Sequence, residues 1–67
     1  MGIDKRIKEL RTDAGLSQAQ LAKHLGVSQK AIDYWERAIN EPKASYILNL
    51  AVFFEVSTDY LLGKIDF

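Results

Sequence analysis

Residues 18–37, QAQLAKHLGVSQKAIDYWER, constrain the fold more than any other part of the chain. Leu21, Ala22 and Leu25 stand at positions i, i+1 and i+4, so they share one side of a helix. Gly26 then interrupts this pattern, at a place where a helix would stop. The small side chain of Ala22 leaves room for another helix to cross close by. This half of the segment therefore predicts a short helix followed by a tight turn.

A second short helix is predicted directly after the turn. Ser28 stands where an N-cap would begin it, and Ile32 and Trp35 point inward at i and i+3. The outward side carries long side chains with polar atoms: Gln29, Lys30, Asp33, Tyr34 and Arg37. Two helices joined by a glycine turn, with such side chains on the outer face of the second, are what a helix that enters the DNA major groove requires.

Apolar residues at helical spacing, serine caps and glycine stops divide the whole chain into five predicted helices. They cover residues 4–13, 18–25 after the Ser17–Gln20 capping box, 29 to about 37, 44–54, and the segment from the Ser57 cap to Gly63. No segment alternates apolar and polar residues as a strand does, apart from the last few residues. We therefore predict one compact all-α domain over residues 1–67, with a short C-terminal tail at residues 64–67.

Composition excludes several classes of protein. The chain has no cysteine and one histidine, His24, so we predict no disulfide and no metal site. Capping or surface roles explain the four serines, and the chain has no glycine-rich phosphate loop, so we predict no enzyme activity, no cofactor and no small-molecule substrate. There is no run of about 18 apolar residues and no apolar signal-peptide core, so we predict no membrane span and a cytoplasmic location.

The charge balance is unusual for a protein that binds nucleic acid. Nine basic and nine acidic residues give a net charge of zero, where an excess of Lys and Arg is typical. The charges are unevenly spread, because residues 1–30 hold six basic and three acidic residues and residues 31–67 hold the reverse. The local potential matters more than the total. We expect modest long-range attraction to DNA and an affinity that depends on dimerisation.

Several motifs together resemble the phage repressor/Cro class of helix-turn-helix proteins, also called the xenobiotic-response-element family. They are LSQAQLAKHLGVSQKAI, then WER, the loop with Pro42, and VSTDYLLG, and the resemblance extends over residues 3–63. It implies a compact five-helix, repressor-like DNA-binding domain with the helix-turn-helix at helices two and three. It also implies a sequence-specific transcriptional regulator, of the prophage or mobile-element type of repressor, that binds a palindromic double-stranded operator as a homodimer.

The outward side chains of the second helix of this motif have the chemistry to read bases. Gln29 presents a paired donor and acceptor that matches adenine, and Lys30 donates to guanine. Asp33 can accept only from cytosine or adenine amino groups and repels phosphate, whereas Tyr34 can meet a thymine methyl group. By resemblance, Gln29, Lys30 and Tyr34 fall on positions that contact bases, and Asp33 is a further candidate. The alternative interpretation is an ordinary solvated helix face.

Contacts to phosphates are expected on both sides of this reading helix. The resemblance places a phosphate clamp at Gln18, where a helix begins, and another at Asn40 and Lys43. Arg37 lies one turn beyond Asp33, at a position from which its side chain can reach the DNA backbone. Such contacts set position and affinity rather than sequence preference.

Arg11 and Glu36 are predicted to form a structural ion pair. Arg11 flanks the apolar stripe of the first helix, and Glu36 directly follows the inward-facing Trp35. Both charges are thereby drawn toward the interior, where neither is tolerable alone. The resemblance implies the same Arg–Glu bridge. The alternative is two independent surface charges.

Three residues depart from the pattern of the family. Ala38 replaces the glycine that usually follows WER in a left-handed turn, so we expect the third helix to run slightly longer. Ile39 replaces a polar residue and exposes an apolar side chain. Lys43 replaces the usual Ser or Thr cap, so the fourth helix should begin less firmly.

The C-terminal end is the predicted dimer interface. It offers more apolar side chains than a short helix can bury against its own core: Tyr60, Leu61, Leu62, Ile65 and Phe67. The alternative is that these side chains fold back over the monomer. An alternative function is also open, namely a protein-interaction or antitoxin-like module on the same fold with weak or no DNA binding. The neutral charge and Ile39 favour it, whereas Gln18, Gln29 and Lys30 favour DNA.

Overall fold

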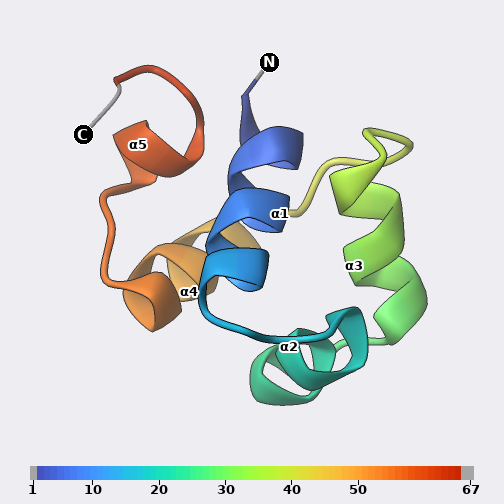
Figure 1. Ribbon diagram of the computed structural model, residues 1–67. Coiled ribbons are helices and arrows are strands. Elements are labelled where there is room, and N and C mark those ends of the chain that lie inside the picture. The colour runs from blue at the N-terminus through green and yellow to red at the C-terminus, as the bar shows by residue number, and fades with distance from the viewer. Residues whose placement is uncertain (1, 66–67) are drawn as a thin grey trace.

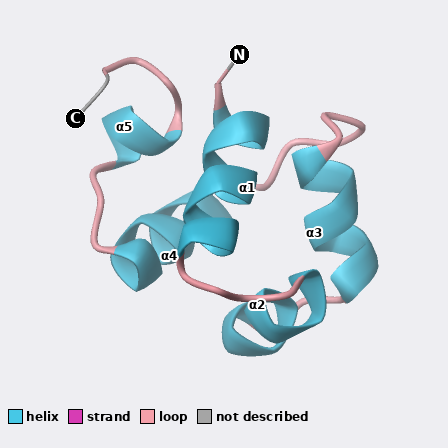
Figure 2. Ribbon diagram, in the orientation of Figure 1, coloured by secondary structure: helices cyan, strands magenta, loops and turns pink. Residues whose placement is uncertain are grey.

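The computed structural model describes residues 2–65, which form five helices and no strand (Figures 1 and 2). The helices are α1 (Ile3–Asp13), α2 (Gln18–Leu25), α3 (Gln29–Glu36), α4 (Ala44–Phe54) and α5 (Thr58–Leu61). In Figure 1, α1 runs through the middle of the molecule, α3 lies at one edge, and α4 and α5 lie toward the other. The prediction of an all-α, five-helix fold is confirmed, and none of the described helices is long and apolar enough to cross a membrane.

The core takes one fully buried side chain from each helix. These side chains are Ile7, Leu21, Ile32, Leu50 and Leu61, each with 0% exposure. Each helix buries one apolar stripe, as the periodicity predicts, because no single short helix is stable without tertiary packing. All five helices of the described chain therefore pack on one core, and Ile32 fixes the position of α3 against it.

Serine side chains begin three of the five helices. The hydroxyl oxygens of Ser17, Ser28 and Ser57 accept hydrogen bonds from the backbone N–H groups of Gln20, Ala31 and Tyr60. Ser17 and Gln20 form the predicted capping box. Lys43 caps α4 without any side-chain bond, which agrees with the expectation of a less firm start. Two predicted boundaries need small corrections, since α1 begins at Ile3 and α5 ends at Leu61 rather than Gly63.

The expectation that the third helix would run longer is wrong. The helix ends at Glu36, and Ala38 adopts a left-handed conformation with φ 58°. Its N–H donates to the carbonyl of Trp35 at 3.2 Å, and the N–H of Ile39 donates to the carbonyl of Tyr34 at 2.9 Å. This is the bond pattern of a Schellman motif, which satisfies carbonyl groups that the helix end leaves free. Ala38 therefore makes the left-handed turn, although glycine would make the same turn with less backbone strain.

The C-terminal end closes against α1. The Nη2 of Arg6 donates to the carbonyl of Ile65 at 3.3 Å, and the guanidinium lies 4.2 Å from the centre of the Tyr60 ring. Leu61 is fully buried in the core of its own chain, so its inclusion in the predicted dimer interface is wrong. The orientation of α5 against the core turns Leu61 inward and leaves Leu62 43% exposed. Phe67, which was also predicted to lie in the interface, is outside the described residues.

Candidate nucleic-acid interface

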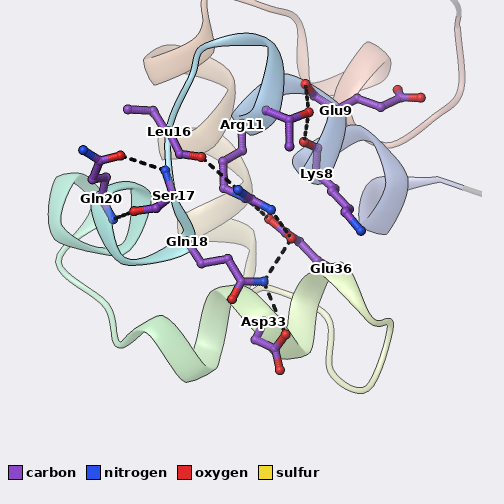
Figure 3. A network of polar contacts seen from close by, with 10 residues as sticks. Lys8, Glu9, Arg11, Leu16, Ser17, Gln18, Gln20, Asp33 and Glu36 are labelled. Atoms are coloured by element: carbon purple, nitrogen blue, oxygen red, sulfur yellow. Dashed lines mark hydrogen bonds and ion pairs between the residues drawn. The ribbon is translucent and has the colours of Figure 1, made fainter.

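A buried ion pair joins α1 to the end of α3. The Nε of Arg11 donates to Oε2 of Glu36 at 2.6 Å, and its Nη2 donates to Oε1 at 2.9 Å. The third donor, Nη1, reaches the carbonyl of Leu16 at 2.8 Å (Figure 3). The two side chains are 11% and 3% exposed. The bond to Glu36 raises the pKa of the Arg11 guanidinium above its ordinary value, while burial works in the opposite direction. The ion pair expected from the sequence is present.

Gln18 extends this network from α2 to α3. Its side-chain Nε2 donates to Oε1 of Glu36 at 3.1 Å and to Oδ1 of Asp33 at 3.3 Å. In Figure 3 the amide of Gln18 points toward these two carboxylates. A side-chain amide has two N–H donors, and both are engaged within the protein. Gln18 was predicted as a phosphate contact, and in this arrangement its side chain instead fixes the crossing of the two helices.

Asp33 and Arg37 form a second, more exposed pair on α3 and its C-terminal cap. The Nε of Arg37 donates to Oδ2 of Asp33 at 3.0 Å, and the two side chains are 59% and 34% exposed. The guanidinium of Arg37 also lies 5.9 Å from the centre of the Tyr34 ring, and the ammonium of Lys30 lies 5.5 Å from it. Two cations thus flank the one aromatic ring on the outer side of α3.

The first turn of α3 is free to meet a ligand. Gln29 and Lys30 are exposed, and Tyr34 is half-buried one turn after Lys30. They belong to α3, which lies at one edge of the molecule in Figure 1 and buries Ile32 and Trp35 in the core. The predicted reading face therefore lies on a helix that is fixed by the core. Asp33 differs from the other side chains of this face, because both oxygens of its carboxylate already accept hydrogen bonds within the protein.

The loop between α3 and α4 begins at the opposite end of α3 from this first turn (Figure 1). Asn40 and Lys43 are exposed, whereas Pro42 between them is buried and anchors the loop. The backbone N–H of Asn40 donates to the carbonyl of Tyr34 at 3.4 Å, so the loop starts from the end of α3. Ile39 is 52% exposed, as expected from the sequence.

The sequence reasoning missed the link from Gln18 to Asp33 and Glu36. Gln18 stands fifteen and eighteen positions before these residues, and no periodicity connects them. The sequence contained one indirect signal of this link. Two helices joined by a tight turn must cross, and the crossing brings the start of α2 against one side of α3. Within residues 2–65 there is also no cluster of three or more side chains suited to hold a metal ion.

Comparison with known proteins finds relatives over nearly the whole chain. A family model described as helix-turn-helix matches residues 7–61. The chain is 39% identical over 64 residues to the HTH-type transcriptional regulator ImmR of Bacillus subtilis, covering 96% of this chain and 50% of that protein. It is 41% identical over 58 residues to repressor protein C2 of Salmonella phage P22, covering 87% of this chain and 27% of that protein. The chain thus spans half or less of the length of these relatives.

A solved structure supports the same relationship. The P22 c2 repressor in complex with a synthetic operator matches the structure with a TM-score of 0.86 and 39% identity, over 92% of this chain and 94% of that one. The match leaves less than a tenth of the chain uncovered. The chain belongs to the helix-turn-helix family.

Proposed function

We propose that this protein is a sequence-specific regulator of transcription that places α3 in the major groove of double-stranded DNA. One observation carries the proposal: an exposed, polar first turn of α3 on a helix that is locked to α1 and α2 through Arg11, Glu36 and Gln18. A reading helix must be rigid, since base contacts require side chains at fixed positions. The similar P22 c2 repressor was solved with an operator, which supports the same role for this chain.

Three side chains are proposed to read bases. Gln29 suits adenine, Lys30 suits guanine, and Tyr34 meets a thymine methyl group with its ring. We now leave Asp33 out of this set, because its carboxylate is occupied by Gln18 and Arg37. If the Asp33 carboxylate gave up the hydrogen bonds from Gln18 and Arg37 to accept one from a base amino group, the net gain in binding free energy would be small.

Contacts to the phosphates are proposed on both sides of α3. Arg37, Asn40 and Lys43 follow the reading helix and are exposed. On the other side, the start of α2 presents backbone N–H groups beside Gln18, as helix N-termini do for anions. The Gln18 side chain itself reaches a phosphate only after it leaves Asp33 and Glu36.

The assignment of α3 is tested by binding to an operator selected from random duplexes. Gln29→Ala should cost about 1–3 kcal/mol at one base position and relax the preference there. Lys43→Ala is the matched control, because loss of a phosphate contact should weaken selected and random DNA by a similar factor. If Gln29→Ala instead weakened both DNAs equally, α3 would not be the reading helix.

We also propose that two copies bind a palindromic operator in the cytoplasm, as a repressor of the prophage or mobile-element type. Their reading helices would then lie about 34 Å apart. The proposed contact uses the C-terminal end, at Tyr60, Leu62, Ile65 and Phe67. Exposed Leu62 supports it, whereas the contacts of Arg6 with Tyr60 and Ile65 show this end partly used within the chain.

Deletion of residues 64–67 tests this dimer. It should reduce operator affinity far more than it lowers the midpoint of thermal unfolding, and the stability must be measured in parallel because the bond from Arg6 to Ile65 is also lost. A truncated protein that bound a palindromic operator as tightly as the intact chain would contradict the proposed interface.

A second candidate is a protein-interaction or antitoxin-like module without strong DNA binding. It is favoured by exposed apolar side chains away from α3, since Leu48 and Val52 on α4 are 57% and 70% exposed. Selection that enriched no duplex sequence, with the folded protein present, would favour this candidate over the first.

A further inference from the structure

The carboxylate of Asp33 lies where two proposed phosphate-binding side chains converge. Its Oδ1 accepts from Nε2 of Gln18 at 3.3 Å, and its Oδ2 accepts from Nε of Arg37 at 3.0 Å. The donors come from the beginning of α2 and from the residue that ends α3. No other acidic side chain among residues 2–65 is bonded to two of the residues predicted to contact phosphates.

A carboxylate in this place imitates a phosphate. Both groups carry negative charge on oxygens that accept from amide and guanidinium N–H groups. Gln18 has both of its amide hydrogens engaged, one on Asp33 and one on Glu36. Arg37 uses Nε for Asp33, so its charge is matched within the protein before any DNA arrives. A phosphate that binds Nε of Arg37 or the amide of Gln18 must take that donor from Asp33.

The exposure of this pair allows the exchange. The Arg37 side chain is 59% exposed and that of Asp33 is 34% exposed, so solvent and an approaching phosphate reach both. The Arg11–Glu36 pair differs, because its side chains are 11% and 3% exposed and it has no access to DNA. The network thus has a fixed inner part and an outer part that is open to competition.

We propose that Asp33 is an internal competitor for the DNA backbone, which holds Arg37 and Gln18 in the free protein and lowers affinity for any duplex. This inference rests on the proposed function and gives Asp33 a positioning role in place of base reading. This competition by Asp33 acts on contacts with phosphates. It therefore limits binding to random DNA, which depends on those contacts alone.

The proposal has a distinct signature in the dependence on salt. While Arg37 stays bonded to Asp33, it neutralises no phosphate and releases no counterion from the DNA. With Asp33 removed as a charge, contact of Arg37 with a phosphate adds about 0.9 to the slope of log affinity against log salt. The gain in affinity should then shrink about threefold between roughly 50 and 200 mM salt.

The experiment compares Asp33→Asn with the intact chain on a selected operator and on a random duplex, over this range of salt. We expect tighter binding to both DNAs, a slope steeper by about 0.9, and an unchanged midpoint of thermal unfolding. Glu41→Gln is the matched control, since it makes the same change of charge at an exposed residue near α3. It should produce neither the tighter binding nor the steeper slope.

A double-mutant cycle with Arg37→Ala separates competition from plain charge repulsion. If Asp33 acts by holding Arg37, most of the gain from Asp33→Asn should disappear in the Arg37→Ala background. A gain of equal size in both backgrounds, or an equal gain from Glu41→Gln, would overturn the proposal and leave the DNA-binding function intact. An intact chain that bound no duplex would overturn both.

Discussion

Removal of the buried Glu36 carboxylate should strongly lower the free energy of unfolding of the domain. Glu36→Ala deletes the acceptor of three hydrogen bonds, two from Arg11 and one from Gln18. Arg11 is 9% exposed and keeps only the carbonyl of Leu16 as a partner. Breaking a buried pair in this way costs about 3–5 kcal/mol, and since water reaches part of the guanidinium we expect about 3 kcal/mol.

That loss is a large share of the total. A domain of 67 residues has a free energy of unfolding of about 3–10 kcal/mol. With a urea slope of about 1 kcal/mol/M, the midpoint should fall by about 3 M. Trp35 is 6% exposed next to Glu36, so its fluorescence reports unfolding directly, with circular dichroism as a second probe. Glu41→Ala, at an exposed loop residue, should change the midpoint little.

The double variant Arg11→Met with Glu36→Leu decides whether the two charges act together. It removes both charges and leaves apolar side chains of similar size, so it should be much milder than either single change. Losses that simply add in this cycle would show that the pair does not interact, and the role assigned to it would be refuted.

Two further predictions concern the turn after α3 and the effect of pH. Ala38→Gly should stabilise the domain by about 0.4–1 kcal/mol in the same urea assay, because φ is 58° at this position; a loss of stability would contradict the left-handed turn. The raised pKa of Arg11 means that its contribution is complete below the unfolded-state pKa and is lost only as pH rises through the higher folded-state value. The stability difference between the intact chain and Glu36→Ala should therefore stay constant from neutral to mildly alkaline pH, and a difference that closed with rising pH would be inconsistent with this.

Features set by neighbours in the sequence were predictable. The serine caps and the stop at Gly26 depend on a few adjacent residues, and the structure has them where the pattern indicated. The Arg11–Glu36 pair joins distant residues, but each lies on the flank of a buried stripe, and two lone charges could not remain there. Burial therefore favoured the pairing, and the resemblance to the family implied the same bridge.

Features set by the packing of one helix against another were not predictable in the same way. Leu61 and Leu62 are adjacent and alike, and only the orientation of α5 against the core decides that the first is buried and the second exposed. Ala38 adopts the left-handed turn because the bonds from its own N–H and that of Ile39 compensate for the strain. Local preference alone favoured a longer helix.

Under the proposed function, the internal pairing of charge predicts that a chain with no net charge contacts DNA but binds it weakly. Arg11 is matched by Glu36 inside the domain, and Arg37 is matched by Asp33 at the proposed interface. Lys30 and Lys43 therefore carry most of the unmatched positive charge beside α3. Affinity for the DNA backbone grows with the number of phosphates neutralised, so we expect one copy to neutralise few phosphates and to hold random DNA weakly. In the proposed dimer, a second copy would double these contacts and add a second reading helix, so we expect occupancy to depend on a sequence that both copies recognise.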